Sequence, residues 1–552
     1  MKKYIYIFSL LLGIVTFNSC DLDKLPSGDL ITEGQKEDVI NPSPEKLEAD
    51  INGITAALAR YDVLNRGDVH YDYGFPAVCL ILESLGQDLW GPASGYNWFS
   101  TPQEYADKTL TSMQSEFLWR TFYYHILACN SILEFAPEGT EDGNLKNYRA
   151  QALAFRAFDY LNLIQIYQFT YVGNEDQPGV PLILEPKEPL GYGNSRVTVK
   201  EVYTQILNDL NEAIELLDGV RRPESDKSKV DQGVAYGLRA RVHLLMQNWK
   251  EAADDAQRAM IGYTPATLEE VSIPGFNTIS AKNWMWGVLI TPETGAVKTG
   301  IVNWPSHLCS FTGNGYTTAV AMYKSANKNL WNKIPKTDIR KDWFVYYPEN
   351  YEPEDPDEPD NSLLRSLLVD SLDVVFYNRN GEEISAAEYY DWNELTNVKF
   401  HAYENKVDNP TNASDWPLMR VEEMILIRAE ALGMNGELDE AKKVLEDFVS
   451  TYRNEEFKSN ASSPEELQDE VWLQRRIEFW GEGLSFFDLM RLKKGVNRVE
   501  NGESSFPSLA RFNIAATDPV LLYLIPEKEI NVNDALTPED NNPSAVAPKP
   551  IK

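Results

Sequence analysis

Hydrophobic residues recur every three or four positions along most of this chain, which is the pattern of amphipathic α-helices. The clearest stripe lies within residues 145–170 and consists of Leu145, Tyr148, Ala152, Phe155, Phe158, Leu161, Ile164 and Tyr167. Residues 198–218 begin with Thr198 and carry Glu201 three positions later, the capping-box pattern of a helix start. Further helices are predicted over 228–247, 249–262, 418–434, 437–453 and 464–494. The sequence therefore predicts a mainly α fold.

Two of these helical regions are copies of one unit. A shift of 189 residues aligns Leu238 with Ile427, Ala240 with Ala429, Trp249 with Leu438, Glu251-Ala252 with Glu440-Ala441, and Ala256 with Leu445. Each copy reads as a helix, a tight turn and a second helix. Tetratricopeptide-type pairs of this kind bury a continuous core only by stacking. We therefore expect a scaffold of tetratricopeptide-like helix pairs over about 40–262 and 416–500.

The stretch between the copies, about 263–415, has a different composition. It is rich in Pro, Gly, Asn and aromatic residues and contains short β-type runs such as Trp284–Ile290 and Val374–Tyr377. It also carries the acidic, Pro-rich segment 352–360, which cannot pack into a core and is expected to be a solvated loop. Calcium binding there is the alternative, although the Pro spacing matches no known calcium loop. We expect 263–415 to be a large loop-rich insertion with short β-strands.

The N-terminus has the pattern of an export signal. Lys2 and Lys3 precede a 14-residue apolar run, Tyr4–Phe17, which is shorter than the roughly 20 residues that a membrane-spanning helix needs. Cys20 follows this run after Asn18 and Ser19, which resembles the position of the acylated cysteine in bacterial lipoproteins, although Phe17 and Asn18 stand where Leu and small residues are usual. We expect residues 1–19 to be removed and Cys20 to carry the lipid. The alternative is an ordinary signal peptide with an incidental cysteine.

The remaining cysteines, Cys79, Cys129 and Cys309, stand apart from one another in the sequence. Three cysteines cannot all pair, and Cys79 and Cys129 lie among apolar residues at helical spacing, so buried free thiols are expected. No two cysteines have metal-ligand spacing.

Charge narrows the range of partners. The 552 residues include 51 Lys and Arg against 84 Asp and Glu, a formal net charge of −33. Such a surface repels nucleic-acid phosphates and anionic lipid headgroups, so neither is expected as the main ligand. A hydrophobic fraction of 43% is that of a globular protein. The chain is expected to form one large body, 20–552, with no nucleic-acid partner.

No catalytic motif accompanies this body. The five histidines, His70, His125, His243, His307 and His401, are scattered, and the sequence contains no H-E-x-x-H, G-x-S-x-G or phosphate-binding glycine motif. We therefore predict that the protein has no catalytic residues, binds no metal and needs no cofactor. A glycosidase needs only two suitably spaced carboxylates, so counting acidic residues does not exclude that alternative.

Aromatic residues outside the helical stripes indicate binding. The first group of candidate ligand contacts comprises Asp88, Trp90, Tyr96, Asn97, Trp98 and Phe99, and the second comprises Asn303, Trp304 and Tyr316. Aromatic faces pack against the C–H faces of sugar rings while polar side chains bind the hydroxyls. The alternative is that these rings fill the core beneath long loops. Trp284 and Trp286 alternate along a predicted strand and are expected to be packed.

Motifs along nearly the whole chain resemble one family, the SusD-like (RagB/SusD) outer-membrane lipoproteins of Bacteroidetes-type bacteria. In order, the matches are Cys20, Ala150–Tyr167, Pro178–Leu182, Arg196–Leu217, Ala235–Ala259, Trp416–Arg420, Ala429–Ala431, Arg475–Arg491 and Leu521–Asn531. Ser485 stands where the family usually has Arg. The charged residues of 475–491 are read as ion pairs between helices rather than as an active site.

The resemblance implies a surface-exposed lipoprotein of the outer membrane, anchored by lipid, that binds an oligosaccharide or polysaccharide. It also implies delivery of this nutrient to a SusC-like TonB-dependent transporter. The family's ligand contacts come from variable loops, so no binding residue is transferred by position. The rival functions are peptide binding on the same scaffold, a scaffold without ligand, and a glycan-degrading enzyme.

Overall fold

The computed structural model describes residues 43–185, 193–220, 222–223, 225–345, 376–377, 383–384 and 393–551. The chain divides into a short unit, Met1–Glu48, and a body, Ala49–Lys552. The expected signal peptide, Cys20 and the acidic segment 352–360 lie outside the described residues. In the first unit, Pro44–Leu47 forms one turn of 3-10 helix.

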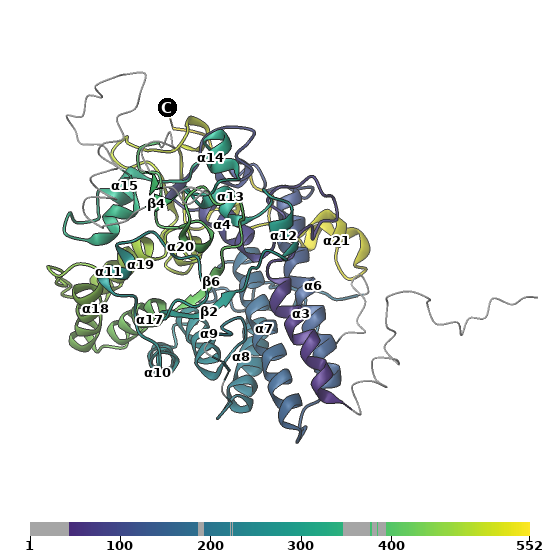
Figure 1. The fold of residues 1–552 in the computed structure, drawn as a ribbon. Helices are drawn as coiled ribbons and strands as arrows, with labels where there is room; N and C mark the ends of the chain where they lie inside the picture. The colour runs from purple at the N-terminus through teal and green to yellow at the C-terminus, as the bar shows by residue number, and fades with distance from the viewer. Residues whose placement is uncertain are drawn as a thin grey trace, which may run out of the picture. The chain divides into compact units, whose positions relative to one another are not determined.

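The body is built mainly from α-helices (Figure 1). The longer ones are α3 (Glu48–Ala57), α4 (Phe75–Leu85), α6 (Met113–Phe135), α7 (Gly143–Tyr167), α8 (Val199–Leu216), α9 (Gln232–Leu245), α10 (Trp249–Ala259), α17 (Val421–Met434), α18 (Leu438–Tyr452) and α19 (Pro464–Glu478). Shorter ones are α5 (Ser100–Gln103), α11 (Leu268–Val271), α12 (Gly295–Lys298), α13 (Trp304–Leu308), α14 (Tyr316–Val320), α15 (Lys328–Trp331), α20 (Ser485–Arg491) and α21 (Glu527–Val532). The mainly α prediction is confirmed.

The strands are short and pair in twos. They are β1 (Leu89–Trp90) with β3 (Ser325–Ala326), β2 (Trp284–Val288) with β6 (Trp416–Arg420), β4 (Phe376–Tyr377) with β5 (Glu383–Ile384), and β7 (Val496–Asn497) with β8 (Asn513–Ile514), all antiparallel. Short 3-10 segments span Ile339–Trp343, Tyr403–Asn405, Ser508–Ala510, Pro519–Leu521 and Pro538–Asp540. Between α10 and α17 the chain therefore forms short helices as well as the predicted loops and strands.

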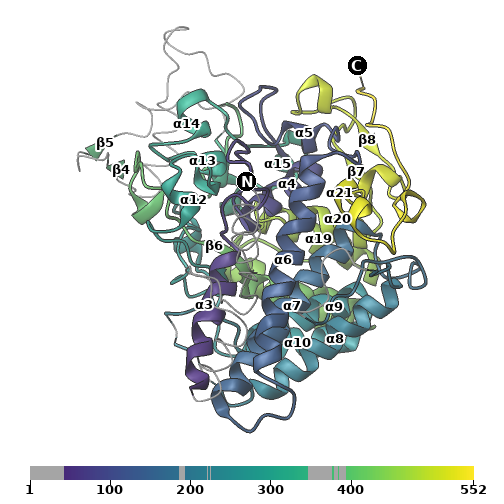
Figure 2. The same ribbon diagram turned by 90° about the vertical axis from the view of Figure 1, so that its right-hand side faces the viewer.

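The helices pack in chain order, with α6 against α7, α7 against α8, α8 against α9 and α9 against α10 (Figure 2). Helix α10 then packs on α17, and α17 packs on α18 and α19. The capping box predicted at residue 198 is present: the Thr198 hydroxyl accepts the Glu201 amide at 3.2 Å, and the Glu201 carboxylate accepts the Thr198 amide at 2.8 Å. This cap fixes where α8 begins.

The two predicted copies are the helix pairs α9–α10 and α17–α18. Their aligned positions are equally buried: Leu238 and Ile427 are each 1% exposed or less, and so are Ala252 and Ala441. Because α10 packs on α17, the stacking that the repeat requires is formed between segments separated by more than 150 residues. The antiparallel pairing of β2 with β6 joins the beginning and the end of the segment between α10 and α17.

The continuous helix predicted over 464–494 is wrong. Helix α19 ends at Glu478 and α20 begins at Ser485. Gly481 and Gly483 lie between them with φ angles of 81° and 89°, in the left-handed region that favours glycine. A Cβ on Gly483 would lie 2.6 Å from the Cβ of Cys79 in α4. The break therefore exists because the chain turns here against α4.

Other packing predictions are confirmed. Trp284 and Trp286 are buried in β2, and Trp286 lies edge-on to Phe155 and Phe158 of α7, with ring centroids 5.2 and 5.0 Å away. Cys79, Cys129 and Cys309 are buried free thiols.

Candidate functional site

The segment from Asp88 to Phe99 joins α4 to α5 and is tied firmly to the core. Strand β1 pairs with β3, and the Asp88 backbone oxygen accepts the Asn327 amide at 2.8 Å and the Trp480 indole N–H at 2.9 Å. The Asp88 carboxylate binds Arg476 through two contacts of 2.6 and 2.8 Å. Asp88 is buried and its carboxylate binds Arg476, which anchors the loop; ligand contact by Asp88 stays a prediction.

Asn97 and Phe99 are also placed in the interior. The Asn97 side chain donates to the Pro92 backbone oxygen at 3.0 Å, which closes the loop on itself. Phe99 is fully buried, and its ring lies 6.4 Å from Tyr73 and 5.2 Å from His307. Both side chains are buried beneath the loop, as expected from the alternative in which these residues fill the core.

Asn303 and Trp304 also lie in the interior, and ligand contact by them stays a prediction. Asn303 caps α13, where its side-chain oxygen accepts the Ser306 amide at 3.1 Å. The Trp304 indole donates to the Ser414 backbone oxygen at 2.8 Å, and its ring packs 5.2 Å from Trp416. Trp304 is 1% exposed, so its ring lies beneath the surface of the insertion.

Four other candidates reach the surface. Tyr96 is 59% exposed, and Trp90, Trp98 and Tyr316 are partly exposed. The Trp90 indole donates to the Ala326 backbone oxygen at 3.0 Å, which holds its ring beside β3. Tyr316 is the first residue of α14, and its backbone amide donates to the Ser306 hydroxyl at 3.1 Å. For these four residues ligand contact remains a prediction.

The tertiary structure brings Trp98 and Tyr316 together around His70. The His70 imidazole stacks on the Trp98 indole, with centroids 4.7 Å apart and planes 19° apart. Its Nδ1 forms a hydrogen bond with the Tyr316 hydroxyl, which also interacts with the Trp98 indole N–H. We call His70, Tyr96, Trp98 and Tyr316 the aromatic platform. Sequence reasoning missed His70, because nothing in the sequence near position 70 indicates a partner 246 residues away.

A second layer of rings supports the platform from below. His307 stacks on Tyr316 with centroids 4.8 Å apart and on Tyr73 at 5.6 Å, and its Nε2 donates to the His70 backbone oxygen at 2.9 Å. Burial holds the pKa of His307 well below its usual value, so its imidazole is neutral at neutral pH. Burial likewise lowers the pKa of His70 and raises that of Tyr316. The platform is therefore uncharged at neutral pH and rests on a fixed base.

The charged residues of 475–491 form buried ion pairs, as predicted. The Glu478 carboxylate binds Arg420 at 2.9 Å, Arg453 at 2.8 Å and Arg340 at 3.2 Å. Asp488 binds Arg475 and Arg491, each at 2.7 Å. The pairs of Glu478 join segments that lie 25 to 138 residues apart in the sequence. Sequence reasoning missed Arg340 and Arg453, which lie outside the motif.

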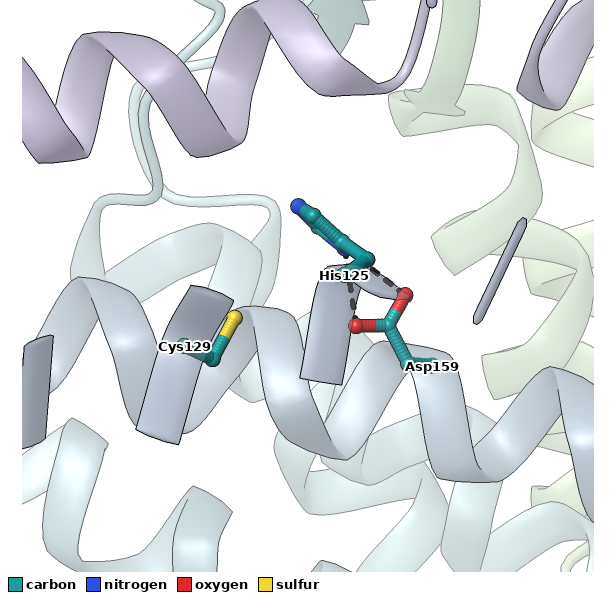
Figure 3. A group of neighbouring side chains, drawn as sticks. All are labelled: His125, Cys129 and Asp159. Atoms are coloured by element: carbon teal, nitrogen blue, oxygen red, sulfur yellow. Dashed lines mark hydrogen bonds and ion pairs between the residues drawn. The ribbon is translucent and has the colours of Figure 1, made fainter. Parts of the chain in front are cut away.

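One cluster of possible metal ligands lies elsewhere. Within the described ranges, His125, Cys129 and Asp159 are the single such group, with ligand atoms within 4.8 Å of one another (Figure 3). The His125 Nε2 donates to the Ile54 backbone oxygen at 2.9 Å, and its Nδ1 lies 2.8–2.9 Å from both Asp159 oxygens. Burial raises the pKa of Cys129 well above its usual value, so the thiol keeps its proton. This geometry is that of a proton shared between His125 and Asp159, which links α3, α6 and α7.

One small, partly open pocket lies among the scaffold helices. It has a volume of about 70 Å³ and lies among α4, α7, α9, β6 and α17, with Phe75, Phe158, Arg241 and Phe479 in its wall. One water occupies about 30 Å³ of the liquid. The cavity therefore has room for a few waters and is too small for a sugar ring.

Two family models of known proteins match this chain. A family model described as "Starch-binding associating with outer membrane" matches residues 82–244, and the model of the SusD family matches residues 253–544. These matches place the helical-pair scaffold in a class of outer-membrane-associated binding proteins. Because the second match spans more than half of the chain, the chain belongs to the SusD family, as its motifs predicted.

Individual relatives agree with this assignment. The SusD-like protein P38 of Formosa agariphila is 23% identical over 434 residues, which cover 74% of this chain and 80% of that protein. A SusD-like carbohydrate binding protein from Bacteroides vulgatus superposes with a TM-score of 0.70 at 23% identity and covers 90% of this chain and 97% of its own. A putative sugar binding protein of the same species gives 0.67 at 21% identity, covering 91% and 99%. At these identities the two structures establish the fold alone.

The matched families consist of binding proteins associated with the outer membrane. Across the described ranges, no helix combines the length with the hydrophobicity that crossing a bilayer requires.

Proposed function

We propose that this protein binds glycans, as oligosaccharides or polysaccharides, through the aromatic platform and has no catalytic role. The observation that carries the proposal is the exposure of Tyr96, Trp98 and Tyr316 above a base of buried rings. A flat, uncharged aromatic surface stacks on the C–H face of a sugar. The carbohydrate- and sugar-binding relatives support a ligand of this class.

The site draws on both predicted parts of the body. His70, Tyr96 and Trp98 come from the N-terminal part of the scaffold, about 40–262, and Tyr316 comes from the insertion, about 263–415. We propose that ligand specificity depends on this junction, since residues from both parts must be in place before the platform exists.

Affinity measurements test this function. The mature chain is titrated with maltoheptaose, since one matching family model is described as starch-binding, and then with a panel of soluble plant and algal polysaccharides. We expect Trp98→Ala to weaken binding at least tenfold, because aromatic stacking supplies much of the contact area. Trp249→Ala, which removes a partly exposed tryptophan at the start of α10, is the matched control and leaves affinity unchanged.

The negative outcomes separate the rival functions. Binding to a peptide digest and to no glycan overturns the proposal in favour of a peptide-binding protein. Shortened products after prolonged incubation with a glycan identify an enzyme. If Trp98→Ala and Trp249→Ala bind the glycan with equal affinity, the ligand site lies elsewhere than on the platform.

We further propose that Cys20 carries the lipid anchor at the outer-membrane surface, with residues 1–19 removed. The apolar run Tyr4–Phe17, with Cys20 three positions after its end, supports this. Two or more acyl chains hold a protein stably on a bilayer, since each buried CH₂ contributes about 0.8 kcal/mol. Cys20→Ala should therefore release the protein into the soluble fraction. Continued membrane attachment of that variant would contradict lipidation.

The proposed partner is a SusC-like TonB-dependent transporter, to which the protein delivers its glycan. Membership in the SusD family supports this proposal. The test is purification of the tagged protein from detergent-solubilised outer membranes. We expect a TonB-dependent barrel at near-equal amounts, and its absence contradicts the partnership.

A further inference from the structure

Two residues with left-handed backbone conformation form the tip of a tight hairpin that follows β7 (Figure 2). Asn501 has a φ angle of 53° and Gly502 one of 83°. Glu500 and Glu503 flank them and exchange backbone hydrogen bonds of 3.1 and 2.9 Å, so the loop between them has two residues. Two-residue hairpin loops of this kind need a positive φ at both positions, which is why Asn-Gly is a favoured pair there.

The same residue pair can react with itself. The glycine nitrogen attacks the side-chain carbonyl carbon of the asparagine, a C–N bond forms, and the side-chain amide leaves as ammonia. The product is a five-membered succinimide ring, which water then opens to aspartate or to isoaspartate, whose main chain runs through Cβ. Glycine favours the attack because it has no Cβ to obstruct the approach. The net change is the gain of one water, the loss of one ammonia and one new negative charge.

The hairpin tip leaves both reacting groups free. Among the described residues, neither the Asn501 side chain nor the Gly502 amide has a hydrogen-bond partner, and both residues are exposed. A Cβ placed on Gly502 would meet nothing within 4 Å. The ring that forms includes the Asn501 Cα and the Gly502 nitrogen, so the turn must loosen briefly before it can close. Such openings cost little free energy at an exposed tip that two hydrogen bonds hold.

The other Asn-Gly pairs of the described residues begin at Asn52, Asn314 and Asn435, and a fifth pair, 380–381, lies outside them. The pair Asn435-Gly436 is as exposed as the hairpin tip but is held by hydrogen bonds at the end of α17. The Asn435 side chain donates to the Glu437 carboxylate at 2.9 Å, and the Gly436 amide donates to a backbone oxygen at 3.1 Å. Because exposure is matched, this pair isolates the effect of those bonds.

The pairs at Asn52 and Asn314 are held by the surrounding structure. Asn52 and Gly53 lie inside α3, where the backbone amides donate along the helix. The Asn314 side chain donates to a backbone oxygen at 3.3 Å, and a Cβ on Gly315 would lie 2.5 Å from the Ser306 Cα of α13. Ring closure at either place requires helix or core contacts to break first.

We propose that Asn501 is a site of spontaneous deamidation in the folded protein, converted to aspartate and isoaspartate by attack of the Gly502 nitrogen and hydrolysis of the resulting ring. Isoaspartate adds one methylene to the main chain of a two-residue loop, so the pair of hydrogen bonds between Glu500 and Glu503 is lost. The new carboxylate also lies next to these two acidic residues. This inference does not depend on glycan binding.

The test compares the Asn-Gly pairs within one molecule. The full mature chain is incubated at pH 8 in water enriched in ¹⁸O, and peptide mass spectrometry follows each pair over time. We expect Asn501 to deamidate at least about ten times as fast as Asn435, because it needs the smaller local opening. Its product should carry one ¹⁸O and consist of both aspartate and isoaspartate.

Two controls separate the fold from the local sequence. In urea, where the hydrogen bonds of the folded chain are absent, the rates at Asn501 and Asn435 should agree within about threefold. Asn501→Asp carries the added charge from the start, and aged wild type should elute with this variant in ion-exchange chromatography. Circular dichroism confirms that both proteins are folded.

Three results would overturn the inference. The first is an equal rate at Asn501 and Asn435 in the folded chain. The second is a preference for Asn501 that persists unchanged in urea, because the flanking sequence would then set the rate. The third is a product that is aspartate alone, because direct hydrolysis of the side chain yields no isoaspartate.

Discussion

Asp88 and Arg476, which lie 388 residues apart in the sequence, form a bidentate ion pair with N–O distances of 2.6 and 2.8 Å. Both side chains are at least 94% buried. Asp88→Ala should lower the free energy of unfolding by about 3–5 kcal/mol, because it leaves a buried guanidinium without its partner. Urea denaturation measures the change. The variant Arg476→Met combined with Asp88→Ala should cost less than the two single changes added together, and additive losses would argue against a coupled pair.

Gln247 and Gly436 occupy the same turn in the two repeat copies, with φ angles of 58° and 92°. Only glycine adopts this left-handed conformation without steric cost, which for other residues is about 1–2 kcal/mol. Gln247→Gly should therefore stabilise the protein by up to about 1 kcal/mol, since the greater entropy of unfolded glycine offsets part of the gain. Gly436→Gln should destabilise it by a similar amount. Thermal unfolding followed by circular dichroism checks both changes, and shifts of the same sign in both would contradict the equivalence of the turns.

Glu83 of α4 is a fully buried acid that holds a proton at neutral pH. Burial raises its pKa to about 8, one carboxyl oxygen accepts the Gly483 amide at 2.8 Å, and the other has no hydrogen-bond partner. Between pH 4.5 and 8 the folded chain binds this proton and the unfolded chain releases it, so Glu83 lowers stability as pH rises. Glu83→Gln lacks this titration.

We therefore expect Glu83→Gln to gain stability relative to wild type between pH 5 and 8, by at most about 1.4 kcal/mol per pH unit. Urea denaturation of both proteins at pH 5, 6, 7 and 8 measures the difference. A constant difference across this range would show that Glu83 is ionised in the folded state.

The buried pair of His125 and Asp159, which ties α6 to α7, should make the free energy of unfolding depend on pH. The buried Asp159 carboxylate raises the pKa of His125 against the opposing effect of burial. The stability that the charged His125 contributes is lost as pH rises through its raised folded pKa, and it declines again in acid once Asp159, whose pKa burial raises to about 6, takes up a proton. Asp159→Asn should therefore destabilise the protein more at pH 6 than at pH 9. Equal losses at the two pH values, measured by urea denaturation, would contradict a shared proton.

Local sequence was sufficient for the helices and for their repeat. The stripe from Leu145 to Tyr167, the capping box at Thr198 and the 189-residue repeat depend on neighbours within a few turns, so periodicity and helix-start signals locate them. The break at Gly481 and Gly483 was missed, because its cause is the close approach of Cys79, about 400 residues away.

For the candidate site, the sequence predicted only which segments are rich in aromatic residues. The sequence by itself determined the helical scaffold, the family motifs, the charge and the presence of aromatic loops between Asp88 and Phe99 and around Trp304 and Tyr316. The tertiary structure decided which of these rings face solvent. It buries Asp88, Asn97, Phe99, Asn303 and Trp304 and leaves Tyr96, Trp98 and Tyr316 at the surface beside His70. The physical reason is that exposure and pairing depend on contacts between distant segments, such as Trp304 with Ser414 and His70 with Tyr316, which lie 110 and 246 residues apart, and no local pattern encodes those contacts.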